Sequence, residues 1–247
     1  MDLRRSRVIA PHLEVLDEAD STNAELAARA AAGALADFAV LLTTNQTAGR
    51  GRLGRTWTAP PGATLAVSVF LAGEASGWMP LLAGVAMQRS VASLVPGAVG
   101  LKWPNDVQLG GLKVAGLLAE LVPGGVVIGA GLNLTMTVEQ LPTSTSTSLT
   151  LQGADPVDLL DRALAGYLRE LRELRTMDAA ALHAAVTAAC STLGRTVRVE
   201  LPGGAELRGT AVRLDEDGRL VVLTPAGERP VAAGDITHLR FPATDVR

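Results

Sequence analysis

Apolar residues along the chain follow two patterns that take turns over most of its length. Short apolar or alternating runs are typical of strands, whereas apolar positions three or four residues apart over longer stretches are typical of helices. The first pattern predicts strands over 12–17, 38–44, 64–71, 99–102, 107–109, 112–122 and 126–134. The second predicts helices from Ser21 to Gly33 and over 78–95, 156–176 and 178–189.

Polar residues refine the starts of two of these helices. Thr22 and Glu25 have the spacing of a capping box, in which side chains satisfy the first backbone N–H groups. Asp155-Pro156-Val157-Asp158 offers a cap and a first-turn proline, which predicts a helix start at residue 156. Residues 45–62 have no apolar period and are rich in Gly, Arg, Thr and Pro, so they predict a long loop, which in a compact domain is usually functional or disordered.

The pattern changes after Gly194. Four short strands are predicted over 196–201, 207–214, 219–224 and 229–232, separated by Pro-Gly-Gly, Asp-Glu-Asp-Gly and Pro-Ala-Gly turns. Short strands with turns at such intervals favour a β-barrel of about fifty residues. We therefore predict two domains, 1–193 and 194–247.

Composition narrows the function classes. The chain has 247 residues, 48% of them hydrophobic and 19% charged, with a formal net charge of −3. That balance is typical of a soluble globular protein and disfavours general nucleic-acid binding. A lone cysteine, Cys190, excludes an internal disulfide, and three histidines far apart in sequence predict no zinc site. We expect a cytoplasmic protein, since no leader pattern and no apolar run of about 18 residues is present.

The basic residues are almost all arginine. Only Lys102 and Lys113 among the 22 are lysine, and an overall bias toward arginine explains the other positions. An ammonium differs from a guanidinium in shape and hydration, so these two positions are candidates for a role that needs lysine.

Three segments are candidates for chemistry. Gly49-Arg50-Gly51-Arg52-Leu53-Gly54-Arg55 combines glycines that allow close backbone approach with arginines that bind phosphate or carboxylate. The same composition also fits a solvated basic loop or an RNA contact. Lys102-Trp103-Pro104-Asn105-Asp106 is either part of a site or a turn at a hairpin entrance. Lys113 lies in an apolar run ending near Gly116, so it faces either solvent or a ligand.

A fourth segment, Gly129-Ala130-Gly131-Leu132-Asn133, has glycines in a predicted strand. It lacks the Gly-x-Gly-x-x-Gly spacing and a following helix, which argues against a dinucleotide-binding fold.

Taken in order, these segments resemble the biotin–protein ligases. The resemblance extends over about residues 12 to 240 and rests mainly on the Gly-Arg-Gly-Arg-x-Gly-Arg loop and Lys-Trp-Pro-Asn-Asp. Ser21-Thr22-Asn23, Gln46, residues 113–120 and residues 129–133 add to it. It implies an α+β fold, a mixed sheet flanked by helices and related to class II aminoacyl-tRNA synthetases, followed by an SH3-like barrel. It also implies a short form without the N-terminal DNA-binding domain of repressor members, because about eleven residues precede the first predicted strand.

The resemblance implies a two-step reaction with ATP and biotin as substrates and Mg²⁺ as cofactor. Biotin is adenylated and then transferred to a lysine of a biotin carboxyl carrier domain. Fixed cations suit this chemistry, which needs little from a protein nucleophile. The implied catalytic residues are Lys113 and Arg52. The implied biotin contacts are Ser21, Thr22, Asn23, Gln46, Arg50, Gly51, Arg52, Lys113 and Gly116. The implied nucleotide contacts are Arg50, Arg52, Arg55, Trp57, Lys102, Asn105, Lys113 and Asn133.

Several expectations stay open at this stage. Mg²⁺ is expected mainly on the phosphates, with Asn133 and Asp106 as candidate ligands, and Arg240 is a weak candidate for reaching ATP. We expect no DNA or membrane partner and a monomer or weak homodimer. Lipoate or octanoate ligases and transferases share the fold and are the nearest alternative. A biotin-sensing or nucleic-acid-binding regulator is the alternative from another class.

Overall fold

A computed structural model describes residues 1–33, 35–201, 204–232 and 234–238. The larger part is a seven-stranded sheet in the order β1-β2-β5-β9-β8-β7-β6, and it is mixed because β1 pairs with β2 in parallel while the other pairs are antiparallel. Its strands are β1 (Leu13–Val15), β2 (Val40–Thr43), β5 (Thr64–Ala72), β6 (Val99–Lys102), β7 (Asp106–Leu109), β8 (Leu112–Val122) and β9 (Gly125–Asn133). The predicted α+β class is confirmed.

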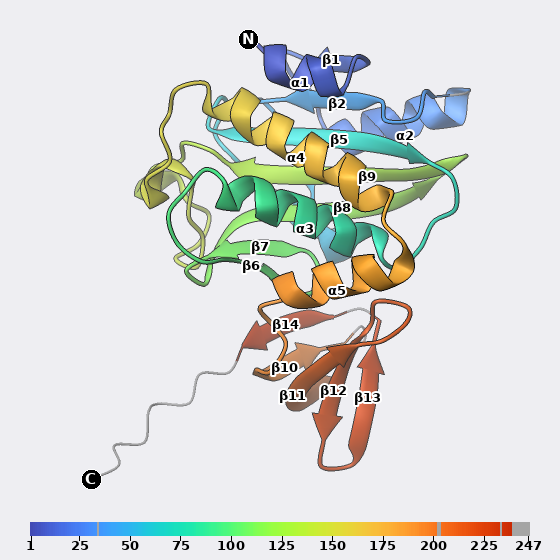
Figure 1. Ribbon diagram of the computed structural model, residues 1–247. Coiled ribbons are helices and arrows are strands. Elements are labelled where there is room, and N and C mark those ends of the chain that lie inside the picture. The colour runs from blue at the N-terminus through green and yellow to red at the C-terminus, as the bar shows by residue number, and fades with distance from the viewer. Residues whose placement is uncertain (34, 202–203, 233, 239–247) are drawn as a thin grey trace.

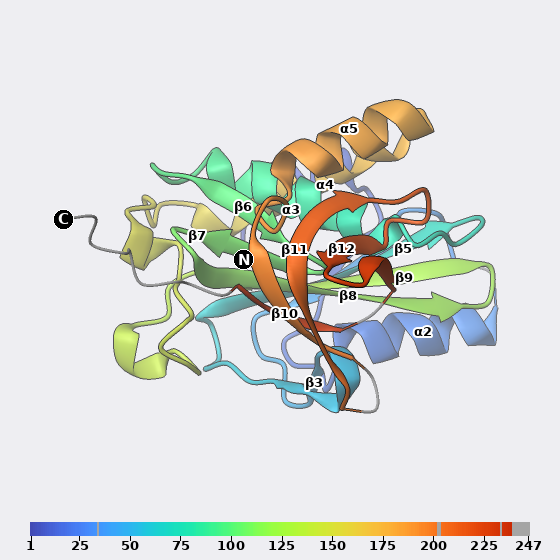
Figure 2. The same cartoon turned by 90° about the horizontal axis from the view of Figure 1, so that it is seen from below.

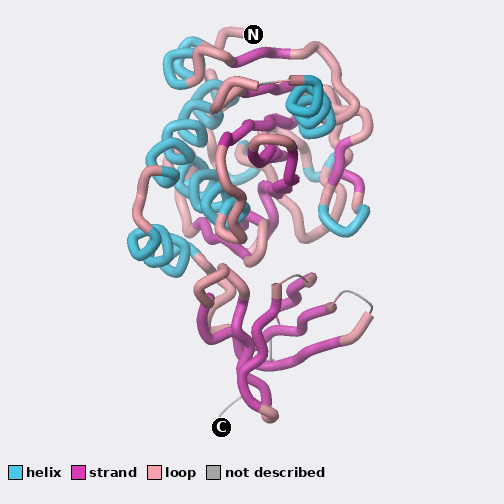
Figure 3. The backbone as a smooth tube through the Cα atoms, turned by 90° about the vertical axis from the view of Figure 1, so that its right-hand side faces the viewer, coloured by secondary structure: helices cyan, strands magenta, loops and turns pink. Residues whose placement is uncertain are grey.

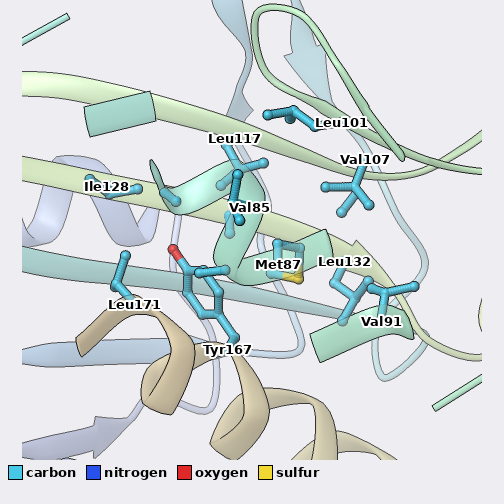
Figure 4. Close-up of a cluster of buried hydrophobic side chains, with 14 of the residues drawn as sticks. Val85, Met87, Val91, Leu101, Val107, Leu117, Ile128, Leu132, Tyr167 and Leu171 are labelled. Atoms are coloured by element: carbon cyan, nitrogen blue, oxygen red, sulfur yellow. The ribbon is translucent and has the colours of Figure 1, made fainter. Parts of the chain in front are cut away.

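Helices cover both faces of this sheet (Figures 1 and 2). α3 (Met79–Ala92), α4 (Leu159–Arg175) and α5 (Ala179–Ala189) lie on one face, and α2 (Thr22–Ala32) lies on the other. Figure 4 shows the core between the first face and its helices, where Met87 of α3 and Tyr167 of α4 meet Ile128 and Leu132 of β9. Burial of such side chains contributes about 1.5–3 kcal/mol each. This packing fixes the sheet and leaves its second face for α2 and a ligand.

The smaller part is a five-stranded antiparallel sheet in the order β13-β12-β11-β10-β14, seen below the larger part in Figures 1 and 3. Its strands are β10 (Thr196–Glu200), β11 (Glu206–Leu214), β12 (Leu220–Thr224), β13 (Gly227–Val231) and β14 (Asp235–His238). The prediction of a small β domain after the helical region is therefore confirmed.

Residues 45–62 are more ordered than predicted. They contain a two-stranded hairpin of β3 (Gly49–Arg50) and β4 (Thr56–Trp57) around the one-turn 3-10 helix η1 (Arg52–Gly54). The hairpin is too short to produce a period of its own in the sequence. It lies on the α2 side of the sheet in Figure 2.

The predicted cap of one helix and the predicted start of another were wrong. Ser21, not Thr22, is the N-cap of α2, because its hydroxyl accepts from the N–H of Ala24 while Thr22 bonds elsewhere. The Asp155 carboxylate accepts from the N–H of Val157 in a local turn, so α4 begins at Leu159 rather than at residue 156.

A short helix at the N-terminus was not predicted. α1 (Arg4–Ile9) has no apolar period, and its first N–H groups are held instead by a distant carboxylate. Asp161 of α4 accepts from the N–H groups of Arg5 and Ser6 and from the Ser6 hydroxyl at 2.6–3.0 Å. Remaining short elements are the 3-10 turns η2 (Val138–Gln140) and η3 (Thr150–Gln152). Among the described residues, no helix has the length and apolar character of a membrane span.

Candidate active site

Two cavities meet under the β3–β4 hairpin. The smaller has a volume of about 140 Å³ and lies between this hairpin, the start of α2 and strands β8 and β9. The larger, about 860 Å³, extends from the other side of the hairpin to α3 and the β11–β12 turn. Both are lined by Arg50, Gly51, Arg52, Arg55, Thr56, Asn105, Leu117 and Leu118. A molecule with a compact ring and a charged tail therefore has room to lie with one end in each.

The inner wall of the small cavity consists of polar side chains that are fixed by one another. The carboxamide oxygen of Gln46 accepts from the N–H and hydroxyl of Thr22 at 3.0 and 3.3 Å. Ser68 lies behind this wall and does not line the cavity; its hydroxyl is 2.7 Å from the Thr22 hydroxyl and 2.6 Å from Oδ1 of Asn23. Ser21, Thr22, Asn23 and Ser68 are all buried, so these bonds are made in a low-dielectric setting. Such a wall is preorganised to bind a neutral polar group.

Glu120 links this wall to the hairpin. One of its carboxylate oxygens accepts from the side-chain amide of Asn23 at 2.7 Å and from Arg50 at 3.2 Å. Sequence reasoning missed Glu120 and Ser68 as site residues. The available signals were a lone serine within the apolar run 64–71 and an acid at the end of the apolar stretch 112–120.

Glycines of the sheet make room for two of the side chains. A Cβ at Gly129 would collide with the carboxamide of Asn23, and a Cβ at Gly131 would collide with the indole of Trp57. Gly116 lies against both Trp57 and the Lys113 ammonium. The Trp57 ring thus forms part of the wall of the small cavity, and its buried indole N–H has no hydrogen-bond partner among the described residues. An unpaired buried donor is available to a ligand acceptor.

Another part of the wall of the small cavity carries cations around one carboxylate. The Lys113 ammonium lies 2.7 Å from Asp106 and 5.9 Å from the centroid of the Trp57 ring. Arg52 donates to Oδ1 of Asn105 at 3.1 Å, and the Asn105 amide donates to the carbonyl of Leu117 at 2.8 Å. Arg52 therefore reaches the Lys-Trp-Pro-Asn-Asp segment from the hairpin and joins two predicted motifs in space.

Burial destabilises the charged forms of two cations in this region, Arg52 and Lys102. Burial lowers the pKa of Arg52, an effect that Asp106 opposes and Arg55 reinforces. Burial also lowers the pKa of Lys102, again opposed by Asp106 and reinforced by Lys113 and Arg55. A cation held at such a cost gains when an anion arrives, so the cluster favours phosphate or carboxylate.

The backbone of Lys113 is fixed on both sides by residues 145–147. Its N–H donates to the carbonyl of Thr145, and its carbonyl accepts from the N–H of Thr147, each at 2.8 Å. The side-chain amide of Asn133 donates to the carbonyl of Thr147 at 2.9 Å. Asn133 thus supports the segment that holds Lys113. Its direct contact with a nucleotide or a metal stays a prediction.

Most of the predicted site residues are brought together. Those lining the small cavity are Ser21, Thr22, Asn23, Gln46, Arg50, Gly51, Arg52, Arg55, Trp57, Asn105, Asp106, Lys113 and Gly116. Lys102 and Asn133 are not among them. Lys102 lines a neighbouring cavity of about 260 Å³ together with Arg55, Asp106 and residues of β10 and β14. Arg240 lies outside the described residues.

Within the described part of the chain, no three His, Cys, Asp or Glu side chains come together as a metal site. Asp106 is the carboxylate next to the cation cluster. One carboxylate fits a hard cation such as Mg²⁺ only when a substrate supplies further oxygens, because Mg²⁺ prefers six oxygen ligands and often takes them from phosphates and water.

Comparisons with known proteins point to one family. Residues 19–135 match the biotin/lipoate A/B protein ligase family, and residues 192–239 match the biotin protein ligase C-terminal domain. The chain is 43% identical to the biotin–[acetyl-CoA-carboxylase] ligase of Mycobacterium tuberculosis over 92% of this chain and 89% of that protein. It is 32% identical to the enzyme of the same name from Paracoccus denitrificans, over 90% of this chain and 98% of that one.

A solved structure is similar over nearly the whole fold. The biotin protein ligase from Aquifex aeolicus, in complex with biotin and ATP, superposes with a TM-score of 0.76 at 26% identity, covering 93% of this chain and 99% of that one. Family profiles, full-length relatives and fold point the same way. The chain therefore belongs to the biotin/lipoate A/B protein ligase family, and within it to the biotin–protein ligases.

Proposed function

We propose that this protein adenylates biotin with ATP and transfers biotin to a lysine of a carrier domain. In the first step a biotin carboxylate oxygen bonds to the α-phosphorus and pyrophosphate leaves. In the second step the carrier amine bonds to the acyl carbon, AMP leaves and the amine loses a proton. The observation that carries the proposal is the meeting of a fixed polar wall with a cation cluster in one small cavity.

The polar wall suits the ring of biotin. A cyclic urea has one acceptor and two donors, and groups of both kinds are presented by Ser21, Thr22, Asn23 and Gln46. These side chains would bind the ring, with Trp57 and Gly116 beside its tail. A wall whose polar groups are already fixed favours an acid whose ring can use their remaining donors and acceptors over an acid with an apolar ring or chain. That argument supports biotin over lipoate or octanoate.

The cations suit the reacting end. Lys113 would bridge the biotin carboxylate and the α-phosphate. Its ammonium, which is paired with Asp106 here, would then stabilise the developing oxyanion. Arg50, Gly51 and Arg52 would close over the intermediate and keep water from the anhydride. Arg55, Lys102 and Asn105 would contact the nucleotide, and Asn133 would lie near it. Mg²⁺, when bound by the phosphates and Asp106, would offset phosphate charge.

The names of the relatives indicate which protein accepts biotin. Their name specifies acetyl-CoA carboxylase as the acceptor, so we propose that a biotin carboxyl carrier domain supplies the lysine. We also propose the division into a ligase domain, 1–193, and an SH3-like domain, 194–247, and a cytoplasmic location.

The test is exchange of labelled pyrophosphate into ATP by the purified protein, with biotin, lipoate or octanoate supplied separately. Biotin-dependent exchange is expected, followed by labelling of a carrier domain. Exchange with lipoate alone would assign the chain to the related lipoate enzymes. A folded sample without exchange on any acid would contradict the proposal.

A further inference from the structure

The β11–β12 turn of the C-terminal domain is a rigid loop held by its own first residue. Oδ1 of Asp215 accepts from the N–H groups of Asp217 and Arg219 at 3.0 and 2.9 Å, and Oδ2 accepts from the Arg219 side chain at 2.7 Å. Burial opposes ionisation of Asp215, but these bonds from Arg219 and Asp217 keep its pKa below the usual value. Gly218 has a φ of +76°, a conformation that favours glycine. The turn therefore presents its carbonyl groups in fixed directions.

Two tryptophans of the ligase domain bind this turn. The Trp78 indole donates to the carbonyl of Glu216 at 2.7 Å, and the Trp103 indole donates to the carbonyl of Gly218 at 3.1 Å. The turn also packs tightly against the start of α3, since a Cβ at Gly77 would collide with the carbonyl of Asp217. The two indole bonds are alike in chemistry and join the same two domains.

Their surroundings differ. Trp78 precedes α3 and makes a tilted ring contact with His183, with 5.3 Å between the centroids, and neither side chain lines the two cavities of the site. Trp103 is 2% exposed and sits between Lys102 and the Pro104-Asn105-Asp106 turn. Its backbone N–H donates to the Thr192 hydroxyl at 3.0 Å, so both its backbone and its side chain are held.

The residues next to Trp103 are those that hold the cations. Asn105 accepts a hydrogen bond from Arg52, and Asp106 forms an ion pair with Lys113. A shift of this segment by a fraction of an ångström would move both partners together, and such misplacement is costly for catalysis. We propose that Trp103 is a positioning residue: through its bond to Gly218, the C-terminal domain fixes the segment that aligns Arg52 and Lys113 with ATP.

This inference rests on the proposed ligase activity, and the test separates the two. Trp103→Phe and Trp78→Phe each remove one indole N–H bond to the same turn and keep an aromatic ring. Both are compared with wild type by thermal unfolding and by pyrophosphate exchange over a range of ATP and biotin concentrations. We expect Trp103→Phe to lower kcat/KM for ATP about tenfold, as for one lost hydrogen bond. KM for biotin is expected to change less than kcat/KM for ATP, because the polar wall that would hold the biotin ring does not contact the segment.

The control is expected to lose thermal stability with less than a twofold change in exchange. Equal effects of the two variants on kcat/KM would overturn the inference while leaving the ligase proposal intact. Absence of exchange in wild type would instead reject the proposed function itself.

A second pair covers the case in which Trp103→Phe does not fold. Gly218→Ala places a Cβ 3.0 Å from Leu81 at a φ of +76°, whereas Gly227→Ala places one at a φ of +106° with open space around it, so both are strained. Only Gly218→Ala is expected to reduce kcat/KM for ATP. Equal kcat/KM in both alanine variants would again reject the role of Trp103.

Discussion

The two walls of the small cavity are built in opposite ways. The wall of α2, β5 and the half-buried Gln46 consists mainly of buried groups whose hydrogen bonds are mostly made within the protein. The wall of the β3–β4 hairpin has two strands of two residues each, an exposed Leu53 with a φ of +56°, and arginines that reach across the cavity. A rigid wall selects a neutral ring, whereas a wall with few buried contacts is able to adjust around charge. Selectivity and charge stabilisation are thus assigned to different parts of one site.

The largest expected effect comes from removing the Lys113 ammonium, which lies between the two walls. Lys113→Ala should lower the rate of biotin adenylation by about 10²–10³-fold, as for loss of one donor to a developing oxyanion. Lys113→Arg keeps the charge and serves as the matched control, with a smaller loss because its fork does not reproduce a compact ammonium. Single-turnover formation of biotinyl-adenylate measures both. Adenylation at the wild-type rate in the alanine variant would remove Lys113 from the mechanism.

A second change tests the adjustable wall. Arg52→Gly should speed release of biotinyl-adenylate by about 10- to 100-fold, since a buried charged hydrogen bond contributes about 1.5–3 kcal/mol. Leu53→Gly also adds backbone freedom to this loop, but relieves the positive φ of Leu53 and removes no charge, so retention should change little. Release is measured by the rate at which free adenylate appears after rapid filtration. If both glycine variants release the intermediate equally fast, the order of the loop rather than the guanidinium retains it.

The rigid wall is tested by a buried hydroxyl. Ser68→Ala leaves Thr22 and Asn23 without one partner and should weaken biotin binding about tenfold, consistent with a cost of about 1–3 kcal/mol for unsatisfied buried groups. Ser90→Ala removes a hydroxyl that is also buried, but one that bonds the carbonyl of Ala163 on the helical side of the sheet. Both variants should lose stability in urea titration. Only Ser68→Ala should lower the affinity for biotin measured by calorimetry. Equal biotin affinities in the two variants would show that Ser68 matters for folding alone.

The smallest expected effect concerns pH. Burial lowers the pKa of Lys102, so this ammonium loses its proton at a lower pH than a free lysine. If the charge helps to bind ATP, KM for ATP should rise on the alkaline side and the rise should begin below the ordinary lysine pKa. Lys102→Arg stays protonated there and should shift that rise to higher pH by a few tenths of a unit or more. Superimposable alkaline profiles would place the dependence on another group.

Much of the fold was predictable because long elements carry their own signal. β5, β8, β9 and α3 are each nine or more residues long and mostly apolar, and the C-terminal strands are separated by clear turn sequences. α1 was not predictable, because its start is fixed by Asp161 more than 150 residues away. The β3–β4 hairpin is defined by pairing between two-residue strands, which leaves no period to detect.

The candidate site divides in the same way. Its charged residues stand out in sequence as motifs, and the structure brings most of them to one cavity. Ser68 and Glu120 act through partners from other elements, so a single serine in an apolar strand or an acid at its end carries no visible role. The link from Trp103 to Gly218 joins positions 115 residues apart and was equally hidden.

The unpaired indole of Trp57 has an optical consequence. The chain has three tryptophans, and two of them donate hydrogen bonds at the interface between the domains. Trp57 alone of these lies in the wall of the small cavity, beside the Lys113 ammonium. A molecule entering there would change the polarity around one emitter and leave the other two in place. The intrinsic fluorescence of the unmodified protein should therefore report occupancy directly, which permits stopped-flow binding measurements without a label.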